Sequence, residues 1–129
     1  MAGTFTAVGE ALALDYMFTA AAVTRPTVWY QALHAGANGG AGAANELAGN
    51  GYARQAVTYT RAGNVMSNST ATAFGPNITA NWGSVTDITV WDSLTGGRCL
   101  AQGTAGAAVI YNVGDTATIA VGAHTISQT

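Results

Sequence analysis

The chain has 129 residues with six Asp or Glu, four Arg and no lysine. A typical soluble domain is about one-quarter charged. So few charges, with net charge −2 and scattered arginines, exclude the basic surface that nucleic-acid binding requires. Either neutral polar residues solvate the surface or other protein copies bury much of it, and we expect the second. The length predicts a single domain over residues 1–129.

The N-terminal segment predicts a helix over about residues 7–22. Thr4 and Thr6 are both candidate N-caps, and Glu10 lies near the positive end of the helix dipole. Its apolar stripe is wide, so we expect it to pack over much of its circumference, with its Met and aromatic residues in the core. The apolar stretch is interrupted by Asp15 and is too short to span a membrane, and no basic residue precedes it. We therefore expect neither a membrane role nor a secretory signal.

A strand is expected over residues 27–34, and a low-complexity Ala/Gly-rich segment follows over about residues 35–51. This segment has no periodicity and few anchoring side chains, so it is predicted to be a long, flexible surface loop. Further short strands begin at Tyr52 and recur to Ser127, with Gly, Asn and Asp between them. The expected fold is mainly β, an antiparallel sandwich or barrel with one N-terminal helix.

Residues 82–105 predict the central β-hairpin of the fold. Period-2 alternation places Val85, Asp87, Thr89 and Trp91 on one side of the first strand. Residues 92–97, Asp-Ser-Leu-Thr-Gly-Gly, form the turn because Asp and Ser bond their own backbone and Gly tolerates positive φ. Both faces of the hairpin carry apolar residues, which indicates a strand pair inside the domain.

No catalytic, metal-binding or cofactor-binding set is evident. His34, His124 and Cys99 fit no zinc spacing, and the glycine-rich segment lacks the Gly-Lys-Ser/Thr ending of a phosphate loop. Cys99 lies in an apolar strand and is expected to be a small buried hydrophobe. The carboxylates are too scattered to suggest a hydrolytic pair. We predict a protein that is not an enzyme and uses no cofactor.

Candidate interface residues are aromatic or arginine side chains, which are enriched where proteins meet. One interpretation of Arg54 is a strand-edge arginine stacked on a tyrosine; the other is a ligand for a carboxylate or carbonyl at a subunit contact. The tryptophans are expected in the core or an interface, although together with Tyr30 they offer an alternative, a stacking platform for carbohydrate. The candidate interface residues are Arg54, Tyr52, Trp29, Trp82 and Trp91.

Several ordered motifs resemble a family of small structural proteins of tailed phages. Its members are labelled tail-fibre-like, and some resemble head decoration or cement proteins. The resemblance runs from the helix to Ser127, although the Ala/Gly-rich loop departs from the more acidic, proline-bearing loop of other members. The motifs are Gly51-Tyr-Ala-Arg-Gln-Ala-Val-Thr, Val65-Met-Ser-Asn, Asn81-Trp-Gly-Ser-Val-Thr-Asp-Ile, Trp91-Asp-Ser-Leu-Thr-Gly-Gly, Leu100-Ala-Gln-Gly and Val113-Gly-Asp.

The resemblance implies a non-enzymatic virion protein made in the host cytoplasm. The first expectation is a capsid cement or decoration protein that binds the major capsid protein and copies of itself, because the chain is small and has no shaft repeats. The alternative is a tail, tail-tip or fibre-associated protein, with host glycans as its candidate ligand. Neither interpretation involves nucleic acid or a membrane.

Overall fold

The computed structural model describes residues 1–128, and within them the chain forms one helix and ten strands. The mainly β class with an N-terminal helix, predicted from the sequence, is confirmed. The elements are β1 (Ala2–Phe5), α1 (Ala7–Phe18), β2 (Trp29–His34), β3 (Gln55–Val57), β4 (Tyr59–Ala62), β5 (Val65–Asn68), β6 (Thr72–Phe74), β7 (Ser84–Trp91), β8 (Cys99–Ile110), β9 (Ala117–Ile119) and β10 (Thr125–Ser127).

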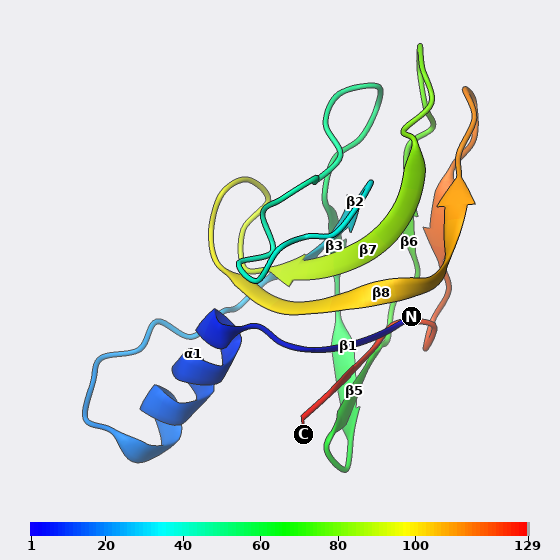
Figure 1. Ribbon diagram of the computed structural model, residues 1–129. Helices are drawn as coiled ribbons and strands as arrows, with labels where there is room; N and C mark the ends of the chain where they lie inside the picture. The colour runs from blue at the N-terminus through cyan, green and yellow to red at the C-terminus, as the bar shows by residue number, and fades with distance from the viewer. Residues whose placement is uncertain (129) are drawn as a thin grey trace.

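Eight strands form a sheet in the order β3-β2-β7-β8-β1-β10-β5-β4, and β6 pairs with β9 in a second, two-stranded sheet. The edge strands of the large sheet, β3 and β4, are separated in sequence by Thr58 alone, so the sheet curls round until its two edges meet. The backbone at this joint bonds to the segment after β5: Ser69 N–H donates to the Thr58 carbonyl at 2.8 Å. The result is a nearly closed barrel (Figure 1).

The first strand, β1, joins two parts of the barrel that are distant in sequence. It pairs antiparallel with β8 and parallel with β10. In the sequence these residues indicate only the approach to the helix, because Ala-Gly-Thr-Phe has no strand pattern of its own. At Gly3 the neighbouring strand is so close that a Cβ atom would lie 2.5 Å from the Gln102 carbonyl oxygen. Pairing with the rest of the sheet therefore sets this strand.

The predicted hairpin is confirmed as β7 and β8, but its simple alternation is wrong at one point. Val85 pairs with Val109 and Asp87 with Thr104, so β7 contributes only Thr86 where β8 contributes residues 105–108. Because of this irregularity, the alternation of side chains between the two faces of the strand is interrupted between Val85 and Asp87. Val85 accordingly packs with Ile88 in the core, whereas period-2 alternation had placed the two on opposite faces.

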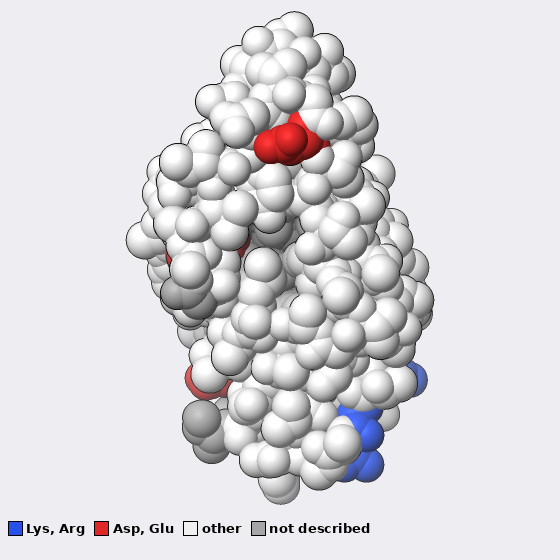
Figure 2. Space-filling view, turned by 90° about the vertical axis from the view of Figure 1, so that its right-hand side faces the viewer, with Lys and Arg blue, Asp and Glu red and all other residues white. Residues whose placement is uncertain are grey.

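The surface carries little charge, as the composition requires. Figure 2 shows a face on which a few isolated acidic and basic groups interrupt an otherwise uncharged surface. Among the described residues there is no helix of the length and hydropathy that a membrane crossing needs.

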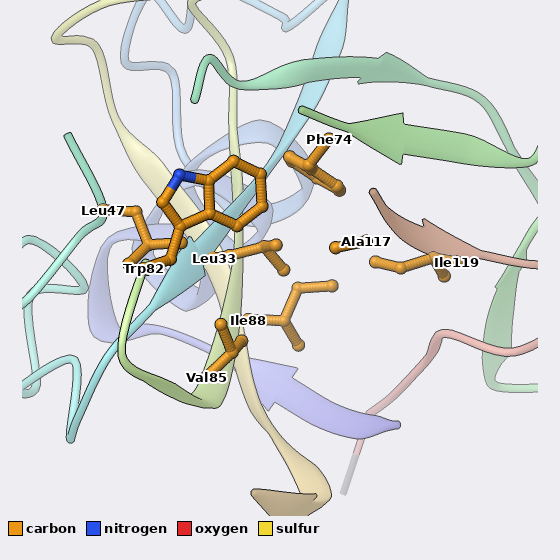
Figure 3. Packing of buried hydrophobic residues seen from close by; sticks show 8 residues of the cluster. All are labelled: Leu33, Leu47, Phe74, Trp82, Val85, Ile88, Ala117 and Ile119. Carbon is orange, nitrogen blue, oxygen red and sulfur yellow. The ribbon is translucent and has the colours of Figure 1, made fainter. Parts of the chain in front are cut away.

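The main core lies between the β2–β7 part of the barrel and the β6–β9 sheet (Figure 3). Phe74 of β6 is fully buried, and Tyr52 stacks on it with ring centroids 6.1 Å apart. Trp82 and Tyr52 pack edge to face, with ring centroids 5.9 Å apart. The buried members of this cluster are Leu33, Leu47, Phe74, Trp82, Val85, Ile88, Ala117 and Ile119.

Helix α1 differs from the prediction in length and in burial. Thr6, not Thr4, is the N-cap, and its side chain accepts a hydrogen bond from Gly9 N–H at 3.1 Å. The helix ends at Phe18 rather than residue 22, because Thr19 is extended and both its N–H and its hydroxyl bond the Asp15 carbonyl. Gly9 is the one helix residue that is buried, and α1 stands outside the barrel in Figure 1. The expected core placement of its Met and aromatic side chains is therefore wrong for the isolated chain.

Candidate interface around Arg54

The glycine-rich loop, residues 35–51, is held to the barrel at several points. Leu47 is buried in the main core. Asn38 donates to Asp87 Oδ2 from its backbone N–H at 3.1 Å and from its side chain at 2.8 Å. The ring Nδ1 of His34 donates to the Ala44 carbonyl at 2.8 Å. The expectation of few anchors is wrong, because single residues within the Ala/Gly run find partners on distant strands.

Arg54 is buried at the point where this loop leads into β3, with 9% of its surface exposed. Its guanidinium forms a two-pronged ion pair with Glu46, Nε to Oε1 at 2.7 Å and Nη2 to Oε2 at 2.8 Å. Nη1 donates to the carbonyls of Ser93 at 2.9 Å and Gly96 at 2.8 Å. The same group lies 4.0 Å above the ring of Trp91. One side chain thus joins the glycine-rich loop, the start of β3 and the hairpin turn.

The negative charge of Glu46 is neutralised by Arg54, and the carboxylate accepts hydrogen bonds from Arg54 and Tyr52. Burial by itself would raise the pKa of Glu46, but the hydrogen bonds and positive charge of Arg54 outweigh it and hold this pKa below its ordinary value. The Tyr52 hydroxyl donates to Glu46 Oε1 at 3.1 Å and accepts from Leu33 N–H at 3.1 Å. Burial raises the pKa of Tyr52, so this hydroxyl stays protonated. Arg54 therefore has a carboxylate and carbonyl ligands inside its own chain.

A second ion pair closes the hairpin turn. Arg98 donates to Asp92 from its backbone N–H at 2.7 Å and from Nε at 2.6 Å. Its Nη2 donates to the Thr24 carbonyl at 2.8 Å, which ties the turn to the segment that follows α1. Burial opposes ionisation of Asp92, but the bonds and charge of Arg98 lower its pKa. The predicted turn over residues 92–97 is present, and the bonds of Arg98 to Asp92 and to the Thr24 carbonyl stabilise it.

The three tryptophans lie in separate environments. Trp82 belongs to the main core and donates from Nε1 to the Asn50 carbonyl at 3.2 Å. Trp91 packs in a second cluster and donates to Thr89 Oγ1 at 2.7 Å. Trp29 is half-buried beside a third cluster. The three rings therefore do not form one surface on which a carbohydrate could stack, and the alternative prediction of such a platform is wrong.

Both histidines are buried and hydrogen-bonded. Since His34 donates from Nδ1 to a carbonyl, its Nε2 accepts from the Thr89 hydroxyl at 2.8 Å. His124 Nδ1 lies 2.8 Å from the Tyr59 hydroxyl and 3.1 Å from Gln31 Nε2. Burial lowers the pKa of His124 to about 4, with a smaller contribution from the N-terminal charge. These are neutral, structural histidines.

Cys99 is buried as predicted, and burial raises its pKa to about 11, so it is a thiol rather than a reactive thiolate. Within residues 1–128 no group of three His, Cys, Asp or Glu is placed to hold a metal ion. Sequence reasoning selected Arg54 but missed Glu46. The available signal was that Glu46 is the one acidic residue in the glycine-rich loop. The interface role of Arg54, Tyr52 and the tryptophans stays a prediction.

The fold is thus a curled β-sheet in which the buried Arg54 is paired with Glu46 of the same chain. A family model described as Podophage GP4 fiber I protein gp80 matches residues 4–127. The chain belongs to this family and is a phage virion structural protein. The search of curated proteins found no match. The phage resemblance seen in the sequence is confirmed, and the fibre description fits the tail or fibre alternative better than the capsid cement expectation.

Proposed function

We propose that this chain is a tail-fibre subunit of a podophage and acts by binding rather than by catalysis. The observation that carries the proposal is the family match over residues 4–127. Decoration of the capsid shell, with the major capsid protein as partner, was the first expectation from the sequence. The fibre description of the family favours the tail position instead.

The construction of the chain supports a mechanical or adhesive role. Its longest loop is bound to the barrel by the Glu46–Arg54 ion pair and the Asn38–Asp87 hydrogen bonds. Loops held in one arrangement present a constant surface, which reduces the entropy lost when a partner binds. The sparse surface charge suits contact with neighbouring virion subunits, including copies of this chain.

The test is to image virions by cryo-electron microscopy with and without the gene for this chain. The proposal expects normal heads in the mutant virions and loss of fibre density at the tail. Complementation with the wild-type gene should restore the same density. Loss of regularly repeated density over the shell, with the fibres intact, would contradict the proposal and support capsid decoration.

Adsorption provides a second readout. If the fibre contributes to host attachment, mutant particles should bind cells more slowly than complemented particles at equal particle number. Heat resistance of the heads should be equal in the two preparations. Reduced heat resistance with normal adsorption is the result expected of a cement protein.

A further inference from the structure

Helix α1 presents apolar side chains to solvent on a part of the molecule that projects from the barrel. Phe18 is 77% exposed and Tyr16 is 67% exposed, and Leu14 and Met17 are each more than half exposed. The apolar residues are not confined to one stripe of the helix. A helix that is apolar on all sides is normally buried. The barrel covers the side of α1 that carries Gly9, and Leu12 and Ala13 are half-buried, but the large side chains toward the C-terminal end of the helix are exposed.

An apolar hollow lies directly beside this helix. It has a volume of about 520 Å³ and is bounded by α1, the segment of residues 23–26 and the start of β2. Arg25 is also part of its lining. A second apolar hollow of about 190 Å³ shares Phe5, Trp29 and Leu100 with the first and leads toward the third core cluster. We call the larger one the helix hollow.

We propose that a second copy of this chain covers α1, with the Phe18 end of the helix of one copy seated in the helix hollow of the other. This inference names the self-contact surface of the proposed virion subunit, but it concerns the isolated chain and is tested without virions. The exposed side chains of Tyr16 and Met17 also line the helix hollow, so the apolar projection and the apolar hollow are adjacent and two copies can cover both.

The charges agree with a second copy as the occupant. Glu10 and Asp15 are the charged residues of α1, and both are acidic. Arg25 supplies a basic group to the hollow. When the Phe18 end of the helix of one copy enters the hollow of the other, Asp15, less than one turn before Phe18, approaches Arg25. A membrane surface is a poorer occupant, because helices that lie on membranes carry Lys or Arg along their polar face.

The first experiment compares Phe18→Ser with a matched control. Val121→Ser removes a side chain that is 64% exposed in the β9–β10 turn, outside the proposed contact. Sedimentation velocity of the full chain over a wide range of concentration measures association. The wild type and Val121→Ser should self-associate alike, and Phe18→Ser should raise Kd by at least about tenfold, the effect of losing a buried aromatic anchor. Near-UV circular dichroism checks that all three are folded.

The second experiment reverses the charges. Arg25→Glu should weaken association because it places acid against acid, and Asp15→Arg added to the same chain should restore it. A wild type that stays monomeric at every concentration would overturn the proposal, as would association that Phe18→Ser leaves unchanged. Equal losses in Phe18→Ser and Val121→Ser would also contradict it. None of these results bears on the tail position of the protein in the virion, which imaging decides separately.

Discussion

Arg54 shows how much one residue contributes when its charge is buried. Its partners come from two segments that are distant from each other in sequence, the glycine-rich loop and the hairpin turn, and its ion pair with Glu46 is largely shielded from water. The attraction within a buried pair does not by itself make the fold more stable than apolar packing would. Removal of one partner is costly, however, because the other charge is then left buried alone.

We therefore expect Arg54→Met to destabilise the chain by about 3 kcal/mol, since Glu46 loses its positive partner and the Ser93 and Gly96 carbonyls lose the donor that Arg54 supplies. Arg54→Lys keeps the charge but not the planar fork, so its loss should be smaller but measurable. The control is Arg61→Met, because Arg61 is exposed and donates to the Gly63 carbonyl within its own turn. Urea unfolding measures all three. An Arg54→Met variant as stable as Arg61→Met would contradict this account of the cluster.

His124 predicts how stability depends on pH. In the unfolded chain its pKa is about 6.5, whereas burial lowers the folded value to about 4. Between these two values the unfolded state binds a proton that the folded state excludes, so the free energy of unfolding falls as the pH falls. The slope approaches about 1.4 kcal/mol per pH unit for one such group. His34, whose pKa burial also lowers, contributes in the same direction.

The measurement is urea unfolding at pH 7, 6 and 5. Stability should decrease across this series in the wild type. His124→Gln should be less stable than the wild type at pH 7 but should show a flatter decrease, because one of the two titrating groups is gone. An unchanged slope in His124→Gln would show that His124 is already protonated in the folded chain or is not shielded from water.

The glycine-rich loop shows that low sequence complexity is compatible with tight packing. Gly42 has φ of +76°, and a Cβ there would lie 2.2 Å from Cys99 Sγ. Gly49 has a similar φ of +67°, but a Cβ there would meet nothing within 4 Å. Both glycines therefore have the left-handed backbone conformation, but only Gly42 is packed against another side chain.

This pair isolates the packing contribution. Gly49→Ala should cost about 1 kcal/mol, the penalty for a left-handed alanine. Gly42→Ala should cost about 2 kcal/mol more, since Cys99 or the loop must move to admit the new methyl group. Urea unfolding compares the two, and Gly42→Ala combined with Cys99→Ala should recover part of the loss. Equal losses at both positions would mean that the loop does not pack against Cys99.

The sequence predicts some elements well because their patterns are local. The β7–β8 hairpin and its turn follow from alternation and turn residues, and the start of α1 follows from Thr6. The shift at Val85 and the strand β1 depend on pairing between distant segments, which no local pattern records. Arg54 was identified as unusual from its position, but its partners Glu46 and Gly96 are brought to it only by the fold.

At the scale of the whole molecule, the two ends of the chain lie in neighbouring parallel strands. Ala2 pairs with Thr125 and Thr4 with Ser127, so β1 and β10 run side by side in the same direction. The N-terminus also donates to the Ala123 carbonyl at 2.8 Å. Tension applied between the two ends pulls these strands along their length in opposite directions. All the hydrogen bonds between them then bear the load together.

We expect the chain to resist such a pull more strongly than one that opens strands from their end. In force spectroscopy, attachment at Met1 and Gln128 should give a higher unfolding force than attachment at Gly63 and Gln128. The second geometry loads the β4–β5 turn and peels the bonds of β5 from β10 one after another. Forced unfolding is governed by the barrier to unfolding, so the contrast should persist at every loading rate. Equal forces would show that the β1–β10 pair is not the mechanical barrier.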